Sequence, residues 1–237
     1  MAKELVTVCL PHCNKDDVHA LLQLTMAPFD RNAPQGDDTI GEWDYWRIDS
    51  GGHPFSVAPG YESDPRIIRS SPDGTDEKQH LSTSFCDGGP RWLLDFEAAR
   101  TAAAAEIESR WREWRELASK YSPTMDWGYF WQRSQRLPEQ YSTQQARNDY
   151  ESQPAIRHIR ENPNLDNRFG YDPVAYYGQD LSDLVYHSIM TALPTEAILT
   201  INGEWVAGWA DNYLEFFNSH LDGLPADTYV IRVTFHS

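Results

Sequence analysis

The chain opens with a short apolar run followed by a segment of helical spacing. Leu5–Leu10 is rich in β-forming residues and ends before Pro11, which predicts a buried strand. Asn14 can cap the helix that follows. Its apolar positions recur every three or four residues, at Val18, Leu21, Leu22 and Met26. The N-terminus therefore predicts a strand and then a helix, with a further strand at Tyr45–Asp49.

The last forty residues repeat this order. Ala197–Ile201 predicts a strand, Asn202-Gly203 a tight turn, and Glu204–Val206 a returning strand. A helix is expected over Asp211–Leu221, and Thr228–Phe235 alternates as a final strand.

Helical spacing dominates the middle of the chain. The longest helix is predicted over Leu93–Tyr121, and a shorter one over Trp127–Arg136. Residues 137–172 are very polar and predict a surface excursion with one short helix, Pro154–Glu161. Another helix is expected between Leu181 and Leu193.

These elements predict an α+β fold. The expected core is an antiparallel, ferredoxin-like β-α-β…β-α-β arrangement with its helices on one face of the sheet. We expect one domain with a core of residues 1–50 and 195–237. Residues 51–92 form a loop-rich segment in this scheme, and residues 93–194 a helical insertion.

The charge is strongly acidic, with 20 Lys and Arg against 36 Asp and Glu and a formal net charge of −16. Nucleic acids and anionic membrane surfaces attract basic patches, so neither is an expected partner. A basic host protein is a compatible partner. The alternative is that the negative charge only keeps the protein soluble and recognises no partner.

The number of cysteines and the length of the apolar runs indicate the cellular compartment. The three cysteines, Cys9, Cys13 and Cys86, are an odd set typical of a reducing compartment. We identify neither a signal peptide nor an apolar stretch of membrane-spanning length. A cytoplasmic location is therefore expected, in the host cell if the protein is phage-encoded.

Nine tryptophans give the chain its most distinctive chemistry, and eight of them form four pairs spaced three or four residues apart. Trp111/Trp114 and Trp127/Trp131 fall on predicted helices with apolar stripes, which favours core packing. Trp205 and Trp209 flank Gly208 and sit at the predicted turn into the last helix, where a ring can cover the end of the sheet. The remaining pair is Trp43/Trp46, and Trp92 stands alone.

The segment around Trp43 and Trp46 is our candidate ligand site. Indoles stack on a nucleobase, a carboxylate accepts from an exocyclic amine, and a guanidinium pairs with phosphate. Two Gly-Gly pairs would let backbone amides approach a ligand. The candidate residues are Trp43, Asp44, Trp46, Arg47, Gly51, Gly52, Asp87, Gly88, Gly89, Arg91 and Trp92. The alternative is that these aromatic residues build the core.

Metal and catalytic signatures are weak. Cys9, His12, Cys13 and His19 offer zinc-type ligands, but the C-x₃-C spacing lacks the second ligand pair that a structural site needs. The histidines occur in no metalloprotease frame, and the sequence has no G-x-S-x-G elbow. We therefore predict no metal, no cofactor and no catalytic residue, although an enzyme of unrecognised type acting on a nucleotide stays open.

Several short motifs occur together in a fixed order. They are Ala27-Pro28-Phe29-Asp30, Trp43-Asp44-Tyr45-Trp46-Arg47-Ile48, Cys86-Asp87-Gly88-Gly89-Pro90-Arg91 with Leu93-Leu94-Asp95, and Leu224-Pro225-Ala226-Asp227-Thr228 with a terminal His236. This order resembles a group of uncharacterised proteins encoded by actinobacterial phages and prophages. The resemblance implies the setting of a phage accessory gene and no particular reaction.

The sequence thus leaves three functions open. The first is a non-enzymatic phage-type accessory protein that binds and sequesters a small nucleotide-like ligand, with a role in evading host defence. The second is an acidic inhibitor of a host protein. The third is a nucleotide-directed enzyme.

Overall fold

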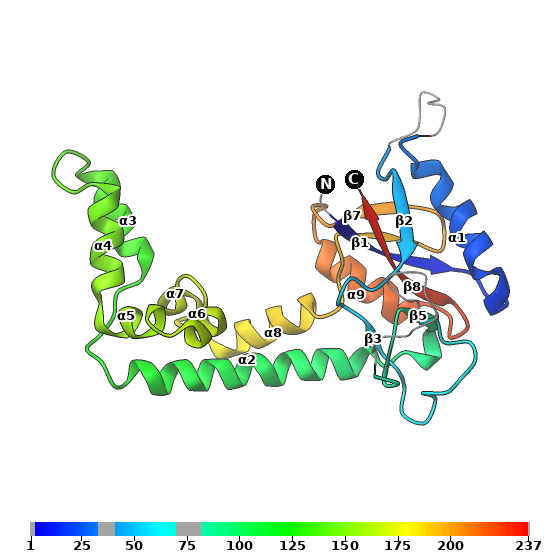
Figure 1. The fold of residues 1–237 in the computed structure, drawn as a ribbon, viewed down its shortest axis with the longest axis horizontal. Helices are drawn as coiled ribbons and strands as arrows, with labels where there is room; N and C mark the ends of the chain where they lie inside the picture. The colour runs from blue at the N-terminus through cyan, green and yellow to red at the C-terminus, as the bar shows by residue number, and fades with distance from the viewer. Residues whose placement is uncertain (1–2, 33–40, 70–81, 237) are drawn as a thin grey trace. The chain divides into compact units, whose positions relative to one another are not determined.

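The computed structural model describes residues 3–32, 41–69 and 82–236, and the chain divides into two compact units. Unit 1 consists of Met1–Arg100 and Met190–Ser237, and unit 2 is Thr101–Ile189. Helix α2 (Phe96–Ala118) carries the chain from unit 1 into unit 2, and α8 (Leu181–Thr191) carries it back. Figure 1 labels these elements.

Unit 1 contains a six-stranded sheet and two further helices. The helices are α1 (Val18–Met26) and α9 (Tyr213–Gly223), and short 3-10 turns occur at Lys15–Asp17, Ala27–Phe29 and Arg91–Leu93. The sheet strands are β1 (Lys3–Leu10), β2 (Tyr45–Ile48), β5 (Gly88–Pro90), β6 (Ala197–Leu199), β7 (Trp205–Ala207) and β8 (Tyr229–His236). A separate two-stranded ladder joins β3 (Phe55–Ser56) to β4 (Phe85–Cys86).

The sheet is mixed, which corrects the expectation of an antiparallel one. Its order is β2-β8-β1-β6-β7, and β5 also pairs with β8. The first and last strands lie side by side and antiparallel, with Lys3 opposite His236 and Leu10 opposite Tyr229 (Figure 1). In contrast, β1 and β6 are parallel, with Val6 opposite Ala197. The long chain between them permits the crossover that parallel pairing requires.

The two helices of unit 1 cover opposite faces of the sheet. Val6 and Val8 of β1 pack with Leu22 of α1, whereas Cys9 packs with Phe217 of α9. Successive side chains of a strand alternate between faces, so two clusters lie on either side of the sheet. We call them the α1 cluster, which contains Val6, Val8 and Leu22, and the α9 cluster, which contains Cys9 and Phe217. The expectation of helices on one face was wrong, and the ferredoxin-like arrangement is not confirmed.

The segment 51–92 contributes to the core although it is rich in Gly and Pro. Phe55, Val57, Ile67 and Cys86 are buried with the α9 cluster. The sequence also predicts a turn at Ser71-Pro72-Asp73-Gly74 in this segment. These four residues lie outside the described part of the chain.

Unit 2 is helical, and its short helices have clear local causes. After α3 (Trp127–Arg136) follow α4 (Thr143–Ser152), α5 (Pro154–Arg160), α6 (Pro163–Phe169) and α7 (Pro173–Tyr177). Three of them begin with proline, whose fixed φ suits the first helical turn. The sequence predicted only α5 within this polar region, because short helices with few apolar residues give little periodic signal.

Two aromatic clusters stabilise unit 2. Trp114 is buried between α2, α6 and α7, with Phe169 at 5.9 Å and Tyr177 at 6.3 Å between ring centroids. Trp127 packs beside the fully buried Tyr150. Core packing is thus confirmed for Trp111, Trp114 and Trp127, while Trp131 is 43% exposed.

Candidate functional site

Trp43, the first residue of the sequence-derived site, is a core residue. Its side chain is only 8% exposed and packs in the α1 cluster. The indole Nε1 donates a hydrogen bond to the backbone carbonyl of Met26 at 3.1 Å. Because its ring and its single donor are both used inside the protein, Trp43 offers no surface to a ligand.

Trp46 and Arg47 point to opposite faces of β2, as neighbours on a strand must. Trp46 packs against the α1 cluster, with its ring 5.4 Å from that of His19. The Arg47 guanidinium pairs with Asp49. Asp44 is exposed in the turn before the strand. The tryptophan and the arginine therefore do not act on one ligand.

The glycine pairs have structural roles. Gly51 and Gly52 adopt positive φ in the turn after β2, where the Gly51 amide donates to Asp49. In β5, Gly88 and Gly89 pair with β8, and a Cβ on Gly88 would lie 2.6 Å from the carbonyl oxygen of Val230. Glycine is thus required for close approach of the strands.

The structure does bring the two Gly-Gly segments together through Asp87. This carboxylate is 2% exposed and accepts a hydrogen bond from the Ser50 amide at 2.9 Å. It joins the turn after β2 to the start of β5. A carboxylate in this position holds two loops together rather than facing a ligand.

Arg91 and Trp92 lie on the face of the sheet opposite Trp43. Arg91 donates to the Leu221 carbonyl at 3.2 Å, and Trp92 packs with the α9 cluster. The Trp92 ring is covered by the Arg66 guanidinium at 4.7 Å and by Tyr61 at 5.0 Å. The sheet therefore separates the two halves of the predicted site.

The zinc alternative also lacks support from geometry. Across residues 3–32, 41–69 and 82–236, no group of three or more His, Cys, Asp or Glu residues is placed to hold a metal ion. Burial raises the pKa of the Cys9 thiol to about 12, which disfavours the thiolate that binds zinc.

A different site lies at one end of the sheet of unit 1. It is a cavity of about 680 Å³ at the end where β1 and β6 begin and β7 and β8 finish. Leu5, Ala197, Ala207 and Phe235 form its floor from these four strands. None of the eleven sequence-derived residues lines it.

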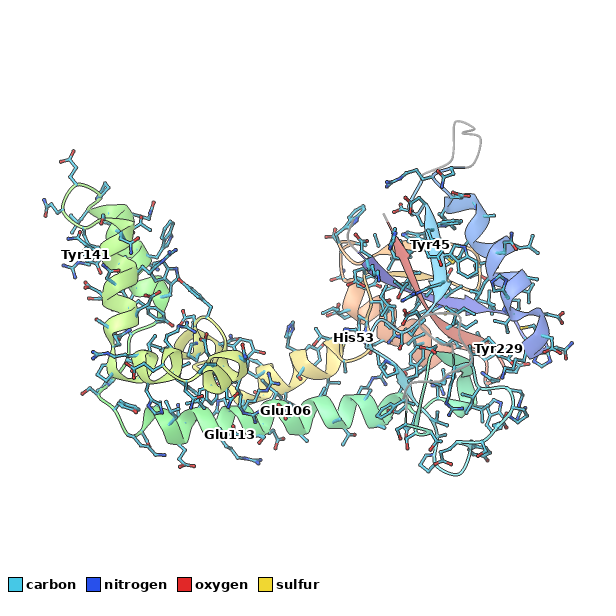
Figure 2. The ribbon with its side chains drawn as sticks, in the orientation of Figure 1. Tyr45, His53, Glu106, Glu113, Tyr141 and Tyr229 are labelled. Atoms are coloured by element: carbon cyan, nitrogen blue, oxygen red, sulfur yellow. The ribbon has the colours of Figure 1, made fainter. Side chains whose placement is uncertain are left out.

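The charged groups of this cavity are predominantly acidic. Glu4, Glu42 and Glu196 line it with His53, whose position is labelled in Figure 2, and among the described residues neither a lysine nor an arginine lines it. Burial raises the pKa of Glu42, the nearby Glu4 carboxylate raises it further, and Arg31 opposes the shift. Two mutually repelling carboxylates at one opening favour a cation between them.

Aromatic rings complete the cavity. The Trp205 ring meets the Phe235 ring edge-on, with 5.5 Å between ring centroids, and lies tilted against the Phe29 ring at 5.2 Å, so it is held between two rings. Trp209 is 89% exposed, the highest exposure of the large hydrophobic residues in the described chain. An exposed indole beside carboxylates is suited to a cationic group, which its π-face attracts.

A buried polar network supports the cavity wall. Thr195, which lines the cavity, exchanges a 3.0 Å hydrogen bond with Thr7, and its carbonyl accepts from the Tyr213 hydroxyl at 2.8 Å. The Arg232 guanidinium donates to Thr7 and, at 2.7 Å, to the Leu193 carbonyl. These bonds fix the start of β6 and hence the neighbouring Glu196.

Sequence reasoning noticed only one part of this site, the Trp205/Trp209 pair at the end of the sheet. The three glutamates come from β1, the segment before β2 and the start of β6, so only the folded sheet brings them together.

The comparisons with known proteins give no relatives. No family model matches the chain, and no curated protein or solved structure matches it either. Within the described residues, no helix is both long enough and apolar enough to cross a membrane.

Proposed function

We propose that the protein works by binding, and that the cavity of unit 1 takes a cationic segment of a basic partner protein. The observation that carries this proposal is the chemistry of the cavity lining: in the part of the chain that the structure describes, it has three glutamates, no lysine or arginine, and the exposed indole of Trp209. An arginine or lysine side chain fits between such groups through charge and cation–π attraction.

The distribution of charge between the units supports the same partner. Unit 1 holds 10 Lys and Arg against 23 Asp and Glu, a formal charge of −13, whereas unit 2 holds 10 against 13, a charge of −3. The acidity is therefore concentrated in the unit that contains the cavity. Such a field accelerates encounter with a basic protein.

The nucleotide-like ligand receives less support at the sequence-derived residues. Phosphate recognition there would use Arg47 or Arg91, and the Arg47 guanidinium already pairs with a carboxylate while Arg91 donates to a backbone carbonyl. A phosphate in the cavity of unit 1 would face three glutamates. The resemblance to phage-encoded proteins supports a host protein as the basic partner.

Calorimetric titration with an arginine-rich peptide tests the proposal, with the same peptide carrying Gln for each Arg as its control. The informative variants are Trp209→Ala and Glu42→Gln. Their matched controls are Tyr186→Ala, an exposed aromatic residue of α8, and Glu151→Gln, an exposed acid of α4. We expect Trp209→Ala to weaken binding roughly tenfold and the controls to leave it unchanged.

The same titration at two ionic strengths tests whether charge attraction drives binding. Raising it from about 0.01 M to about 0.15 M shortens the Debye length from about 30 to about 8 Å and should weaken the complex markedly. Binding of nucleotides together with no binding of the arginine-rich peptide would contradict the proposal and favour the nucleotide-like ligand.

A further inference from the structure

Unit 2 contains a cavity of its own, independent of the site in unit 1. Its volume is about 580 Å³, and its walls come from α2, α6 and α7 with the connection between α6 and α7. A cavity of this size is in the usual range for small-molecule sites.

The walls are aromatic. Phe169 and Tyr177 are buried and meet edge-to-face at 5.8 Å, with Trp114 packed behind them. Tyr171 and Tyr176 also line the cavity and remain 52% and 40% exposed. Rings that are held from behind and open in front form a preorganised surface for stacking on a flat ligand.

The charged groups at this cavity are already paired within the protein. Arg168 donates to Glu113 at 2.7 Å and to Glu106 at 3.3 Å, and Glu106 also accepts from Arg110 at 2.6 Å. Glu106 and Glu113 lie two turns apart on α2 (Figure 2). This network of two acids and two bases is neutral as a whole, so it gives no excess charge for a phosphate.

The Asp172 carboxylate, which also lines the cavity, is hydrogen-bonded within the protein. One of its carboxylate oxygens accepts from the Tyr150 hydroxyl at 3.1 Å, and the other accepts from the Trp127 amide at 2.9 Å. It therefore fixes the start of α7 relative to α3 and α4.

Two side-chain amides also face this cavity. Asn167 and Gln179 line the cavity and are exposed, and their side-chain amides make no hydrogen bond to any other residue of the described chain. Each amide offers a donor and an acceptor side by side, which matches the edge of a nucleobase.

We propose that this cavity of unit 2 binds an uncharged, planar heterocycle of the nucleobase or nucleoside class. The tyrosine rings supply stacking, Asn167 and Gln179 read the polar edge, and the internally paired arginines leave the affinity independent of a phosphate. The same ring is present in a free nucleoside and in a single-stranded oligonucleotide. The net charge of −16 favours the free nucleoside.

The full chain is titrated with adenosine, guanosine, cytidine and uridine, and binding is followed by saturation-transfer NMR and calorimetry. Tyr176→Ala and Gln179→Ala are compared with Tyr129→Ala and Gln132→Ala, two exposed positions of α3. We expect one or more nucleosides to bind, each cavity variant to weaken binding roughly tenfold, and both controls to bind as the wild type does. Circular dichroism shows that each variant is folded.

Further titrations test the role of the ligand's charge and of the cavity in unit 1. The 5′-monophosphate of the best nucleoside should bind no more tightly, a short oligonucleotide should bind less tightly, and Trp209→Ala should change nothing. Failure of all four nucleosides to bind would overturn the inference. Unchanged affinity in the cavity variants, or a monophosphate more than about tenfold tighter than its nucleoside, would overturn it too.

Discussion

Arg232 lies with its guanidinium over the ring of Phe55, 4.1 Å from the ring centroid, in the core of unit 1. Burial lowers the pKa of this arginine to about 9, and its Nε is a buried donor that finds no hydrogen-bond acceptor in the described part of the chain. Among the described residues, no carboxylate forms a salt bridge with it. An aromatic face and two oxygen acceptors thus replace the usual counter-charge.

This environment predicts how Arg232 tolerates replacement. Arg232→Met keeps much of the volume and removes a buried cation, at the cost of one unpaired carbonyl, so we expect a loss of about 1–2 kcal/mol in the free energy of unfolding. Arg232→Ala also leaves a cavity and should cost about 3–5 kcal/mol. Chemical denaturation measures both values, and equal losses would show that the charge itself is required.

Glu42 should affect stability and binding in opposite directions. Its folded-state pKa is raised above 4.5, so its favourable contribution is present below that pH and is lost as the pH rises through the folded value. At pH 7 Glu42→Gln should therefore stabilise the protein, by less than about 1 kcal/mol for this partly exposed group. The gain should vanish near pH 4, as thermal unfolding at the two pH values would show.

The same substitution removes a carboxylate from the cavity and should weaken the arginine-rich peptide several-fold. If Glu42→Gln changed neither the stability nor the peptide affinity, that result would contradict the electrostatic account of the site.

His220 makes stability depend on pH near neutrality. The imidazole stacks on the Phe216 ring with 5.6 Å between ring centroids, and its buried Nε2 has no hydrogen-bond partner among the described residues. Burial lowers its pKa from 6.5, and the Glu204 carboxylate opposes this shift. The folded state then binds fewer protons than the unfolded state, so this contribution is complete above pH 6.5 and is lost as the pH falls towards the folded value.

The slope that His220 contributes cannot exceed about 1.4 kcal/mol per pH unit. Stability curves of wild type and His220→Phe between about pH 5 and pH 7 should differ by this contribution. Parallel curves would mean that His220 titrates alike in both states.

The three cysteines should differ in reactivity. Burial raises the pKa of Cys9 and of Cys86 to about 12, and it also raises that of Cys13, which is only partly buried. A thiol-specific disulfide reagent should therefore modify Cys13 alone, and slowly, in the native protein, and all three after denaturation. Rapid native labelling of two thiols would contradict this placement.

The sequence predicted the elements in which the apolar spacing is strong. The apolar run at Leu5–Leu10 is part of β1, the amphipathic segment Trp127–Arg136 is α3, and the alternating C-terminal segment is β8. The spacing predicted where these elements lie better than which faces they bury, because β8 is buried on both faces and Trp131 of α3 is exposed. Strand order and the direction of β6 depend on contacts between distant segments, which local spacing does not encode.

The candidate site was harder to predict for a related reason. Trp43 and Trp46 have the composition of a stacking site, yet the same residues suit a buried face, and only packing distinguishes the two. Glu4, Glu42 and Glu196 carry no shared motif, because they come from three segments distant in the sequence that only the fold brings to one cavity. Trp209 gave the one local signal, an aromatic residue next to a glycine at a turn.

The indole signal of Trp209 tests the central claim most directly. In ¹H–¹⁵N NMR spectra it is assigned among the nine tryptophan indoles by its absence in Trp209→Ala. Titration with the arginine-rich peptide should shift this signal in a saturable manner, with the Kd found by calorimetry, and the Gln-substituted peptide should leave it in place. Peptide binding that leaves the Trp209 signal unmoved while other indoles shift would place the partner elsewhere and contradict the account.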